Sequence, residues 1–292
     1  SILNLENKNY LHDELEFEIT KTCYDLNFEI DIKKKYPFLK KKQINLLKKA
    51  FIKTTQKTFQ IEKSVLPALT KLEVEWNKIK KTKIDNLKKI LKILPILKQS
   101  GTLVFANSAR AGFVSISILN SLRDINLIKQ KDFDNFMSSL KTVSKKYLED
   151  LYLLKKGKIN LKTFFVSYGH LRPNTYNIKS EKYADLNFKR IIANSISKKI
   201  KIKEFNFRNS ILNKVNLKLK QDDFGYNADY IVKYLKIGIQ NREFTKLIFT
   251  KVLSDILDIL KNYSLKNQIS LDEFSNLDFR DILRLNNKLK IK

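Results

Sequence analysis

The chain has 292 residues, and its hydrophobic fraction of 43%, with 19 Phe and 12 Tyr, excludes an intrinsically disordered protein despite the high charge. Its formal net charge of +28 makes nucleic acid and an anionic membrane candidate partners. Only eight of the 58 basic residues are Arg, and the lysines recur along nearly the whole chain. This pattern favours a solvated lysine surface over a nucleic-acid partner.

The rare residue types exclude several kinds of site. Cys23 is the only cysteine, which excludes an internal disulfide and a thiolate-rich metal site, and we expect it to be a small buried side chain. His12 and His170 are the only histidines, so we expect no metal site. No run of about 18 apolar residues is apparent, and residues 1–20 carry acids where a signal peptide would be basic and then apolar. We therefore expect a cytoplasmic protein with no membrane partner.

The first third of the chain has the pattern of helices. Only six glycines and four prolines punctuate the sequence, so long helices are expected to dominate. The ranges 41–60 and 62–94 have amphipathic periodicity, and Pro37, Pro67 and Pro95 mark candidate starts or breaks.

Two stretches have a pattern that suits a strand. Residues 27–33 and 199–208 alternate apolar and polar side chains, and the second is equally compatible with a loop. The predicted fold class is mainly α, a large irregular helical domain with long connecting loops and at most minor β structure.

The clearest helical pattern lies at 132–155, where apolar residues repeat at three- and four-residue steps. Asp132 is a candidate cap for its start, and Gly157 lies just beyond its end. A second helix is predicted from about 229 to 262, with Gly238 as a candidate break.

A third helix is predicted to begin near Ser270, because Ser270 and Glu273 fit a reciprocal S-x-x-E capping box. No internal repeat is apparent. We therefore predict a single helical domain over residues 1–292, with a candidate sub-boundary near 96–100.

Two segments interrupt the helical pattern, 100–113 (SGTLVFANSARAGF) and 168–183, which begins YGHLRPNTYN. Irregular segments on a rigid scaffold are where binding groups are commonly placed. We therefore predict that the functional site lies here.

The second segment brings five chemically capable side chains within nine residues. Gly169 is expected to end a helix at 161–168, and Pro173 to stiffen the turn that follows. An Arg would pair with phosphate or carboxylate, and a His could shuttle a proton near neutral pH. The side chains are Tyr168, His170 (the candidate acid or base), Arg172, Thr175 and Tyr176. The alternative is that His170 and Arg172 cap the C-terminus of the preceding helix.

In the first segment, small residues surround Arg110, and Gly112 is a candidate turn residue. Because the dipole disfavours Arg in the first turn of a helix, we expect Arg110 to face an anion or a buried carboxylate. The alternative is close helix packing, with Arg110 directed to water. A third candidate is the pair Arg242 and Lys246, one helical turn apart, which would form a paired cationic site or simply a solvated surface.

Known nucleotide-binding and catalytic motifs are missing from the sequence. It contains no G-x-x-x-x-G-K-[ST] loop, no G-x-G-x-x-G, no H-E-x-x-H and no nucleophile elbow. We therefore predict no cofactor in this chain.

Four stretches, taken together, resemble the central helical domain of phosphoenolpyruvate synthase and pyruvate phosphate dikinase-like proteins, which are related to rifampicin phosphotransferases. These are SGTLVFANSARAGF, YGHLRPNTYNI, REFTKLIFTKVLSD and, more weakly, LEVEWNKI near residue 72. In the family pattern glycine is usual where this chain has Asn174, and aspartate where it has Asn177.

The resemblance implies a part of a larger ATP-dependent phosphotransferase. Whole proteins of the family use ATP and Mg²⁺ on an ATP-grasp-like domain and carry the phosphoryl group on a histidine of a swivelling domain. Neither is visible in this chain, so both are expected as partners, in cis or in trans, together with a small-molecule acceptor. The chain itself would bind that acceptor or organise the other domains, and alone would be inactive. The alternatives are a basic helical nucleic-acid-binding protein and a purely structural helical module.

Overall fold

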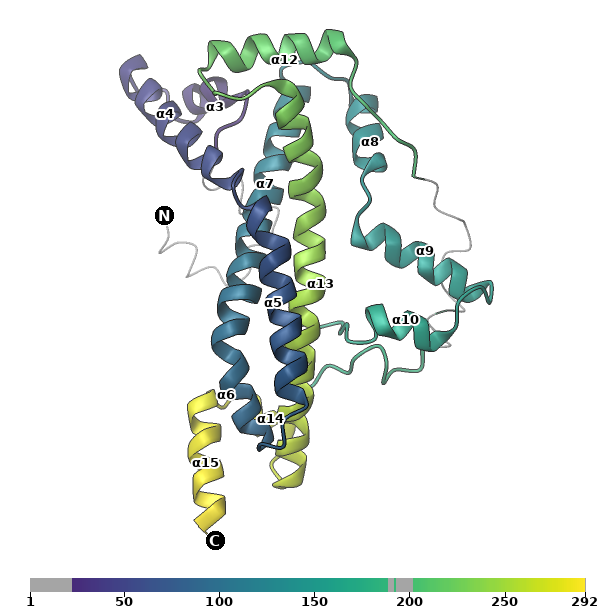
Figure 1. Ribbon diagram of the computed structural model, residues 1–292. Coiled ribbons are helices and arrows are strands. Elements are labelled where there is room, and N and C mark those ends of the chain that lie inside the picture. Colours follow the sequence, from purple (N-terminus) through teal and green to yellow (C-terminus); the bar gives the residue numbers. More distant parts are fainter. Residues whose placement is uncertain (1–22, 189–191, 193–201, 292) are drawn as a thin grey trace. The chain divides into compact units, whose positions relative to one another are not determined.

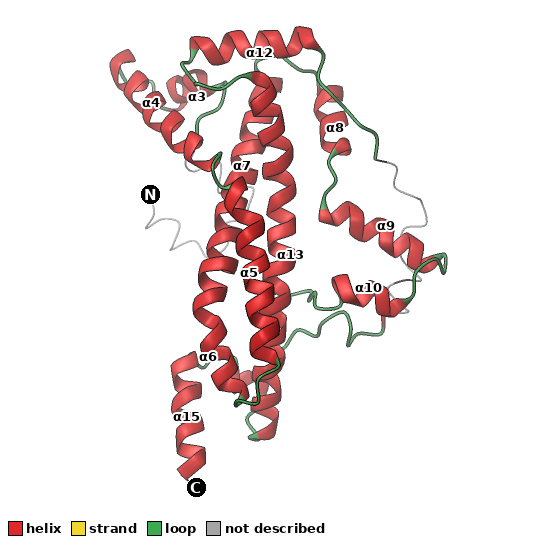
Figure 2. Ribbon diagram, viewed as in Figure 1, coloured by secondary structure: helices red, strands yellow, loops and turns green. Residues whose placement is uncertain are grey.

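The structure is a computed structural model that describes residues 23–188, 192 and 202–291. Over these residues it contains helices and connecting segments and no strand, which confirms the mainly α prediction (Figures 1 and 2). The stretch 27–33 lies largely in a helix, and 202–208 is an irregular connection. Residues 199–201 of the second candidate strand lie outside the described part of the chain.

The chain divides into two compact units, and neither is a continuous stretch of sequence. Unit 1 comprises residues 1–62, 109–140 and 203–239, and unit 2 comprises 63–108, 141–202 and 240–292. The predicted sub-boundary near 96–100 falls inside unit 2. Two helices, α7 (Leu103–Asp124) and α13 (Ala228–Lys266), contribute several residues to both units, and α5 (Glu62–Lys80) contributes only its first residue to unit 1.

Unit 1 is built on one hydrophobic core. Its largest fully buried side chains include Tyr24, Phe28, Phe136 and Phe224. Its helices are α3 (Phe28–Lys35), α4 (Lys41–Thr58), α8 (Gln130–Ser139), α12 (Asn209–Gln221) and the unit 1 parts of α7 and α13. Cys23 is buried in this core as a free thiol, as predicted.

Gly238 does not divide α13, which runs without interruption for 39 residues. A Cβ atom on Gly238 would lie 2.3 Å from the Ser115 Oγ and 2.9 Å from the Ala111 carbonyl oxygen, both on α7. The glycine therefore permits two helices of unit 1 to approach closely, and the predicted break was wrong.

Unit 2 has two hydrophobic clusters. The larger includes Leu72, Trp76 and Ile93, and the smaller surrounds Phe164 and Tyr168. Its helices are α5 (Glu62–Lys80, from Lys63), α6 (Asn86–Ile96), the π-helix η1 (Leu97–Thr102), α9 (Val143–Lys155), α10 (Leu161–Tyr168), α14 (Leu271–Phe274), α15 (Phe279–Ile291) and the unit 2 parts of α7 and α13.

Two of the predicted helices are each split in the structure. The range 62–94 forms α5 and most of α6, whereas Pro67 and Pro95 lie inside these helices and break neither. The range 132–155 forms α8 and α9, because Leu140 is extended and Thr142 begins α9 by accepting a hydrogen bond from the Lys145 N–H.

Individual capping predictions fare differently. Asp132 is not the N-cap residue of α8 but its third residue. Its carboxylate accepts a hydrogen bond from the N–H of the N-cap residue Lys129 at 3.1 Å. The capping box of Ser270 and Glu273 is present, as predicted, but α14 is only four residues long.

The segment 100–113 is helical, so the prediction of an irregular loop was wrong. It completes η1 and forms the first eleven residues of α7, so Gly112 lies within a helix and is no turn residue. The continuous run Asn86–Asp124 is long and apolar enough to cross a membrane by length and composition alone. Its apolar side chains include core positions such as Ile90 in unit 2 and Val114 in unit 1.

Candidate functional site: a buried arginine network on helix α13

The second irregular segment begins at the end of α10, where the sequence predicted it. The Gly169 N–H donates to the Phe165 carbonyl at 2.9 Å and closes the helix. Gly169 has an ordinary φ of −61°, so its left-handed freedom is not used. A Cβ atom there would lie 2.7 Å from the Phe165 carbonyl oxygen, and close approach is therefore what requires glycine.

Tyr168 is buried among the aromatic rings of the smaller unit 2 cluster. Its hydroxyl donates to the Asp150 Oδ2 at 2.9 Å. Burial and the bond to Asp150 raise the pKa of Tyr168 above its usual value. The phenol is thus a fixed neutral donor.

The remainder of the segment is a loop closed by backbone hydrogen bonds. The Tyr183 N–H donates to the Leu171 carbonyl at 2.8 Å, and the Ala184 N–H to the Gly169 carbonyl at 3.0 Å. Its tip is more open: Pro173 and Tyr176 are exposed and Thr175 is half-buried.

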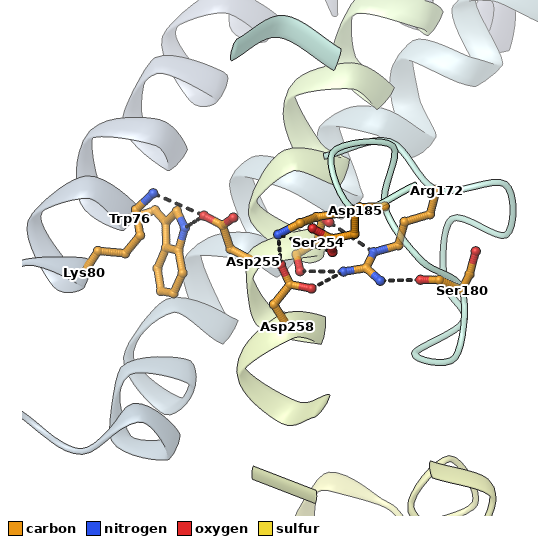
Figure 3. A network of polar contacts seen from close by, with 9 residues as sticks. Trp76, Lys80, Arg172, Ser180, Asp185, Ser254, Asp255 and Asp258 are labelled. Atoms are coloured by element: carbon orange, nitrogen blue, oxygen red, sulfur yellow. Dashed lines mark hydrogen bonds and ion pairs between the residues drawn. The ribbon is translucent and has the colours of Figure 1, made fainter. Parts of the chain in front are cut away.

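Arg172 holds this loop on α13 (Figure 3). Its side chain is 2% exposed, and its Nε donates to the Ser254 Oγ at 3.1 Å. Nη2 donates to the Ser254 carbonyl at 3.3 Å and to the Asp258 Oδ1 at 2.5 Å, while Nη1 donates to the Ser180 carbonyl. Four of the five N–H donors of the guanidinium therefore have acceptors within unit 2.

Carboxylates on α13 extend the network to other segments. The Lys182 Nζ donates to the Asp258 Oδ2 at 2.7 Å and lies 3.8 Å from Asp185. One turn away, Asp255 accepts from the Trp76 indole at 2.7 Å and from Lys80 at 3.1 Å, both on α5 (Figure 3). Burial is the largest single influence on Lys182 and lowers its pKa, but the hydrogen bond to Asp258 together with the charges of Asp258 and Asp185 outweighs it, and the pKa is raised.

His170 also contacts α13. Since a carbonyl only accepts, the ring Nε2 donates to the Leu247 oxygen at 3.0 Å, and the neutral tautomer leaves Nδ1 as a lone-pair acceptor. This Nδ1 is buried and has no hydrogen-bond partner among the described residues. Burial lowers the pKa of His170 to about 4, against the Leu247 bond, so the ring is neutral near pH 7.

Neither His170 nor Arg172 bonds to a carbonyl of α10 in these contacts, so the helix-cap interpretation does not describe them. Both instead make long-range contacts with α13.

All four segments that carry the family resemblance have residues that meet on α13 within unit 2. Trp76 of LEVEWNKI bonds to Asp255, and Arg172 of the loop bonds to Ser254. In SGTLVFANSARAGF, a Cβ atom on Gly101 would lie 2.8 Å from the Phe249 ring, on which Phe105 stacks with centroids 5.9 Å apart.

The predicted cations do not join this network. Arg242 and Lys246 share α13, as predicted, and both are exposed. Arg110 belongs to unit 1 and is exposed. It is the eighth residue of α7, so the prediction that it lies in the first turn of a helix was wrong.

A pocket lies in unit 1 and contains none of the predicted site residues. It has a volume of about 600 Å³ and is lined by Asn45, Lys48, Lys49, Ile52, Lys53, Gln56, Gln221, Asp222 and Asp223.

Sequence reasoning missed a buried charge cluster beside this pocket. Asp222 accepts from the Tyr24 hydroxyl, from Lys48 at 2.5 Å and from Lys218, whose Nζ lies 3.1 Å away, and Lys48 also donates to Glu29 at 2.7 Å. Burial alone would raise the pKa of Asp222, but these hydrogen bonds outweigh it and hold the pKa below its usual value. No local signal distinguished Asp222 from the exposed Asp223.

Asp258 and Ser254 were also missed, although their spacing of four residues places them on one helical face. Among the described residues, no group of three His, Cys, Asp or Glu side chains could hold a metal ion. Comparison of the chain with protein-family models, with curated proteins and with solved structures gives no match.

Proposed function

We propose that this chain is the acceptor-binding or organising central domain of a phosphoenolpyruvate synthase-like, ATP-dependent phosphotransferase, and that organising the other domains is its main role. ATP, Mg²⁺ and the phosphorylated histidine would belong to partner domains, in cis or in trans. The proposal rests first on the sequence resemblance of four separate segments. The single structural observation that supports it is that residues of all four meet on α13 in unit 2.

The organising role is favoured over direct acceptor binding because the polar groups of the loop are already occupied. Arg172 uses four of its donors within the protein, Tyr168 donates to Asp150, and the His170 N–H donates to Leu247. A buried arginine with this many protein acceptors fixes a loop and has little capacity left for a phosphate.

An acceptor would therefore meet the loop tip, where Tyr176 is exposed and Thr175 half-buried, or the exposed face that carries Arg242 and Lys246. The His170 Nδ1 is a lone-pair acceptor, and with a pKa of about 4 it would accept a proton only weakly at neutral pH.

The test is phosphoryl transfer in a preparation that contains this chain together with its nucleotide-binding and swivelling partners. Incubation with radiolabelled ATP and Mg²⁺ is expected to place acid-labile label on a histidine outside this chain. The label should then pass to a small acceptor. If no acid-labile phosphohistidine forms in such a preparation, the proposed function is wrong.

Substitution at the network separates organisation from chemistry. Arg172→Ala is expected to slow transfer of label to the acceptor while histidine labelling by ATP continues. The control is Arg280→Ala, because Arg280 is exposed and pairs with Asp278 at the surface. An equal effect of the two substitutions would contradict an organising role for the Arg172 network.

A further inference from the structure

The most concentrated positive charge of the chain lies in the helical hairpin formed by α3 and α4. From residue 32 to residue 61 the sequence has ten lysines and no Asp, Glu or Arg. Six of these lysines flank the turn between the helices, which reads KKKYPFLKKK from 33 to 42. We call residues 28–58 the basic hairpin; it lies wholly within unit 1.

Two of the ten lysines are engaged within the protein. Lys48 is paired with Glu29 and Asp222, and Lys35 also has an interaction partner. The remaining eight are exposed and make no ion pair with any described residue: Lys33, Lys34, Lys40, Lys41, Lys42, Lys49, Lys53 and Lys57. This charge is therefore available to an external partner.

Part of the free charge forms a stripe along α4. Lys42, Leu46, Lys49, Lys53 and Lys57 follow one another at steps of four, three, four and four residues, which places them on one face of the helix. All five are exposed, and Leu46 retains 62% of its surface.

Apolar side chains accompany the lysines. Phe38, between the two lysine triplets of the turn, is 76% exposed and contacts the half-buried Tyr36 ring edge-on at 6.1 Å between centroids. Ile30 on α3 is 62% exposed. A partner that offers both negative charge and an apolar phase would engage the lysines and these apolar groups together.

We propose that the basic hairpin binds peripherally to a membrane surface that contains anionic phospholipid. The lysines lie against the phosphate layer, where clusters of four to eight basic residues are attracted. Phe38 and Leu46 enter the boundary between headgroups and acyl chains, as apolar side chains of interfacial helices do. Such docking is distinct from insertion across the bilayer and goes beyond the proposed phosphotransfer role.

Nucleic acid is the competing polyanion, and the side chains of the hairpin favour lipid. The 23–62 region has no Arg, which is the usual bidentate reader of phosphate and base edges. Phe38 could stack on an unpaired base, but the aliphatic Ile30 and Leu46 have no comparable partner in a nucleic acid.

The test is co-sedimentation of the purified chain with vesicles of phosphatidylcholine alone and of phosphatidylcholine and phosphatidylglycerol in equal amounts. Binding is expected only to the anionic vesicles and should weaken with added salt. The combined substitution K42Q/K49Q/K53Q/K57Q is expected to lower the partition coefficient by roughly six hundredfold, since each lysine near an anionic surface contributes about fivefold.

The matched control is K71Q/K88Q/K92Q/K98Q, which removes the same charge from exposed lysines of unit 2. It should lower binding by less than about threefold, an allowance for the reduced net charge alone. Equal losses from the two sets would overturn the proposal, because binding would then follow net charge and not the hairpin.

Phe38→Ser tests the apolar contribution and keeps all charges. Because Phe38 is largely exposed, the substitution should leave the circular dichroism spectrum unchanged and lower vesicle binding by about tenfold. Val166→Ser, at an exposed residue of unit 2, should have no effect. The lipid proposal is overturned if Phe38→Ser leaves vesicle binding unchanged, or if the chain binds random duplex DNA at salt concentrations that abolish vesicle binding.

Discussion

Each unit has a buried charged side chain at the centre of a polar cluster, Asp222 in unit 1 and Arg172 in unit 2, and these two charges have opposite signs. In unit 1 the Asp222 carboxylate is surrounded by the donors of Tyr24, Lys48 and Lys218. In unit 2 the Arg172 guanidinium is surrounded by acceptors, among them Asp258. In both, the buried group is almost fully enclosed and a partner of opposite charge reaches solvent.

The sign of the buried charge determines how each cluster responds to a change of pH and to substitution of its charged groups. Protonation or substitution of a buried carboxylate removes its negative charge, and the surrounding cations are then left without a partner. A buried guanidinium keeps its charge at all ordinary pH values, so the unit 2 network responds to its acceptors and to neighbours that titrate. Trp76, the only tryptophan, lies in unit 2, and its fluorescence therefore reports on that unit.

The largest effect is expected from neutralising the buried acid of unit 1. Asp222→Asn leaves Lys48 and Lys218 without their shared carboxylate, and breaking a buried ion pair costs about 3 to 5 kcal/mol. Urea unfolding followed by circular dichroism measures this loss. Asp223→Asn, at the exposed neighbouring residue, should change the unfolding free energy by less than about 0.5 kcal/mol; comparable losses would show that Asp222 is not the centre of the cluster.

Acid should weaken unit 2 before unit 1. The pKa of His170 is about 4 in the folded protein and 6.5 in a free side chain, so the unfolded state binds a proton first as pH falls. Above pH 6.5 His170 is neutral in both the folded and the unfolded state, and its contribution to stability is fully present. Between pH 6.5 and 4 the unfolded state takes up the proton, and the free energy of unfolding falls by about 3 kcal/mol.

The loss attributed to Asp222 follows at lower pH, since its folded pKa lies below 3.8 and its contribution persists above that value. The measurement is urea unfolding across this range, followed by Trp76 fluorescence for unit 2 and by circular dichroism for the whole chain, which includes the unit 1 helices. In His170→Gln the dependence between pH 6.5 and 4 should disappear, and an unchanged slope would contradict the assignment to His170.

A smaller loss of unfolding free energy is expected from substitution of Asp258, which lies at the partly exposed side of the Arg172 network. Asp258→Asn keeps an acceptor oxygen but removes the charge opposite Arg172 and Lys182, at a cost of about 2 kcal/mol. The matched control is Asp272→Asn, whose pair with Lys179 is exposed and contributes at most about 1 kcal/mol. Fluorescence-detected unfolding that ranks the two substitutions in the opposite order would refute this account.

The smallest effect is expected at the helix contact within unit 1. Gly238→Ala introduces a methyl group 2.3 Å from the Ser115 Oγ, and overpacking of this kind costs about 1 to 2 kcal/mol. Adding Ser115→Ala should recover part of the loss, which thermal unfolding by circular dichroism would show. No recovery would indicate that the Ala111 carbonyl alone opposes the methyl group.

Periodicity predicted the helices that are amphipathic over many residues, such as α4 and α13. It failed between α8 and α9, because Leu140 continues the apolar spacing while its backbone is extended. It failed also at Gly101 and Gly112, which lie inside helices and were interpreted as part of a loop. At Gly101 the small residue permits close packing against the Phe249 ring.

The candidate site was less predictable than the helices, because its partners are distant in the sequence. The segment around Arg172 was singled out from its own residues, yet its acceptors Ser254 and Asp258 are 82 and 86 positions away. Local sequence also cannot indicate which member of the pair Asp222 and Asp223 is buried. Such contacts are decided by tertiary packing.

The π-helix η1 determines the direction in which the residues after it point around the helix axis. Ile93, Leu97, Gly101 and Phe105 recur at strict steps of four, a spacing that in a regular α-helix would drift around the axis by about 40° per step. The wider turn of η1 takes more residues per revolution and cancels part of that drift. Removing one residue from 97–102 would advance Phe105 by about 100° and take it off the Phe249 ring. One extra residue in a single turn thus keeps Gly101 and Phe105 on the side of the helix that meets Phe249 of α13.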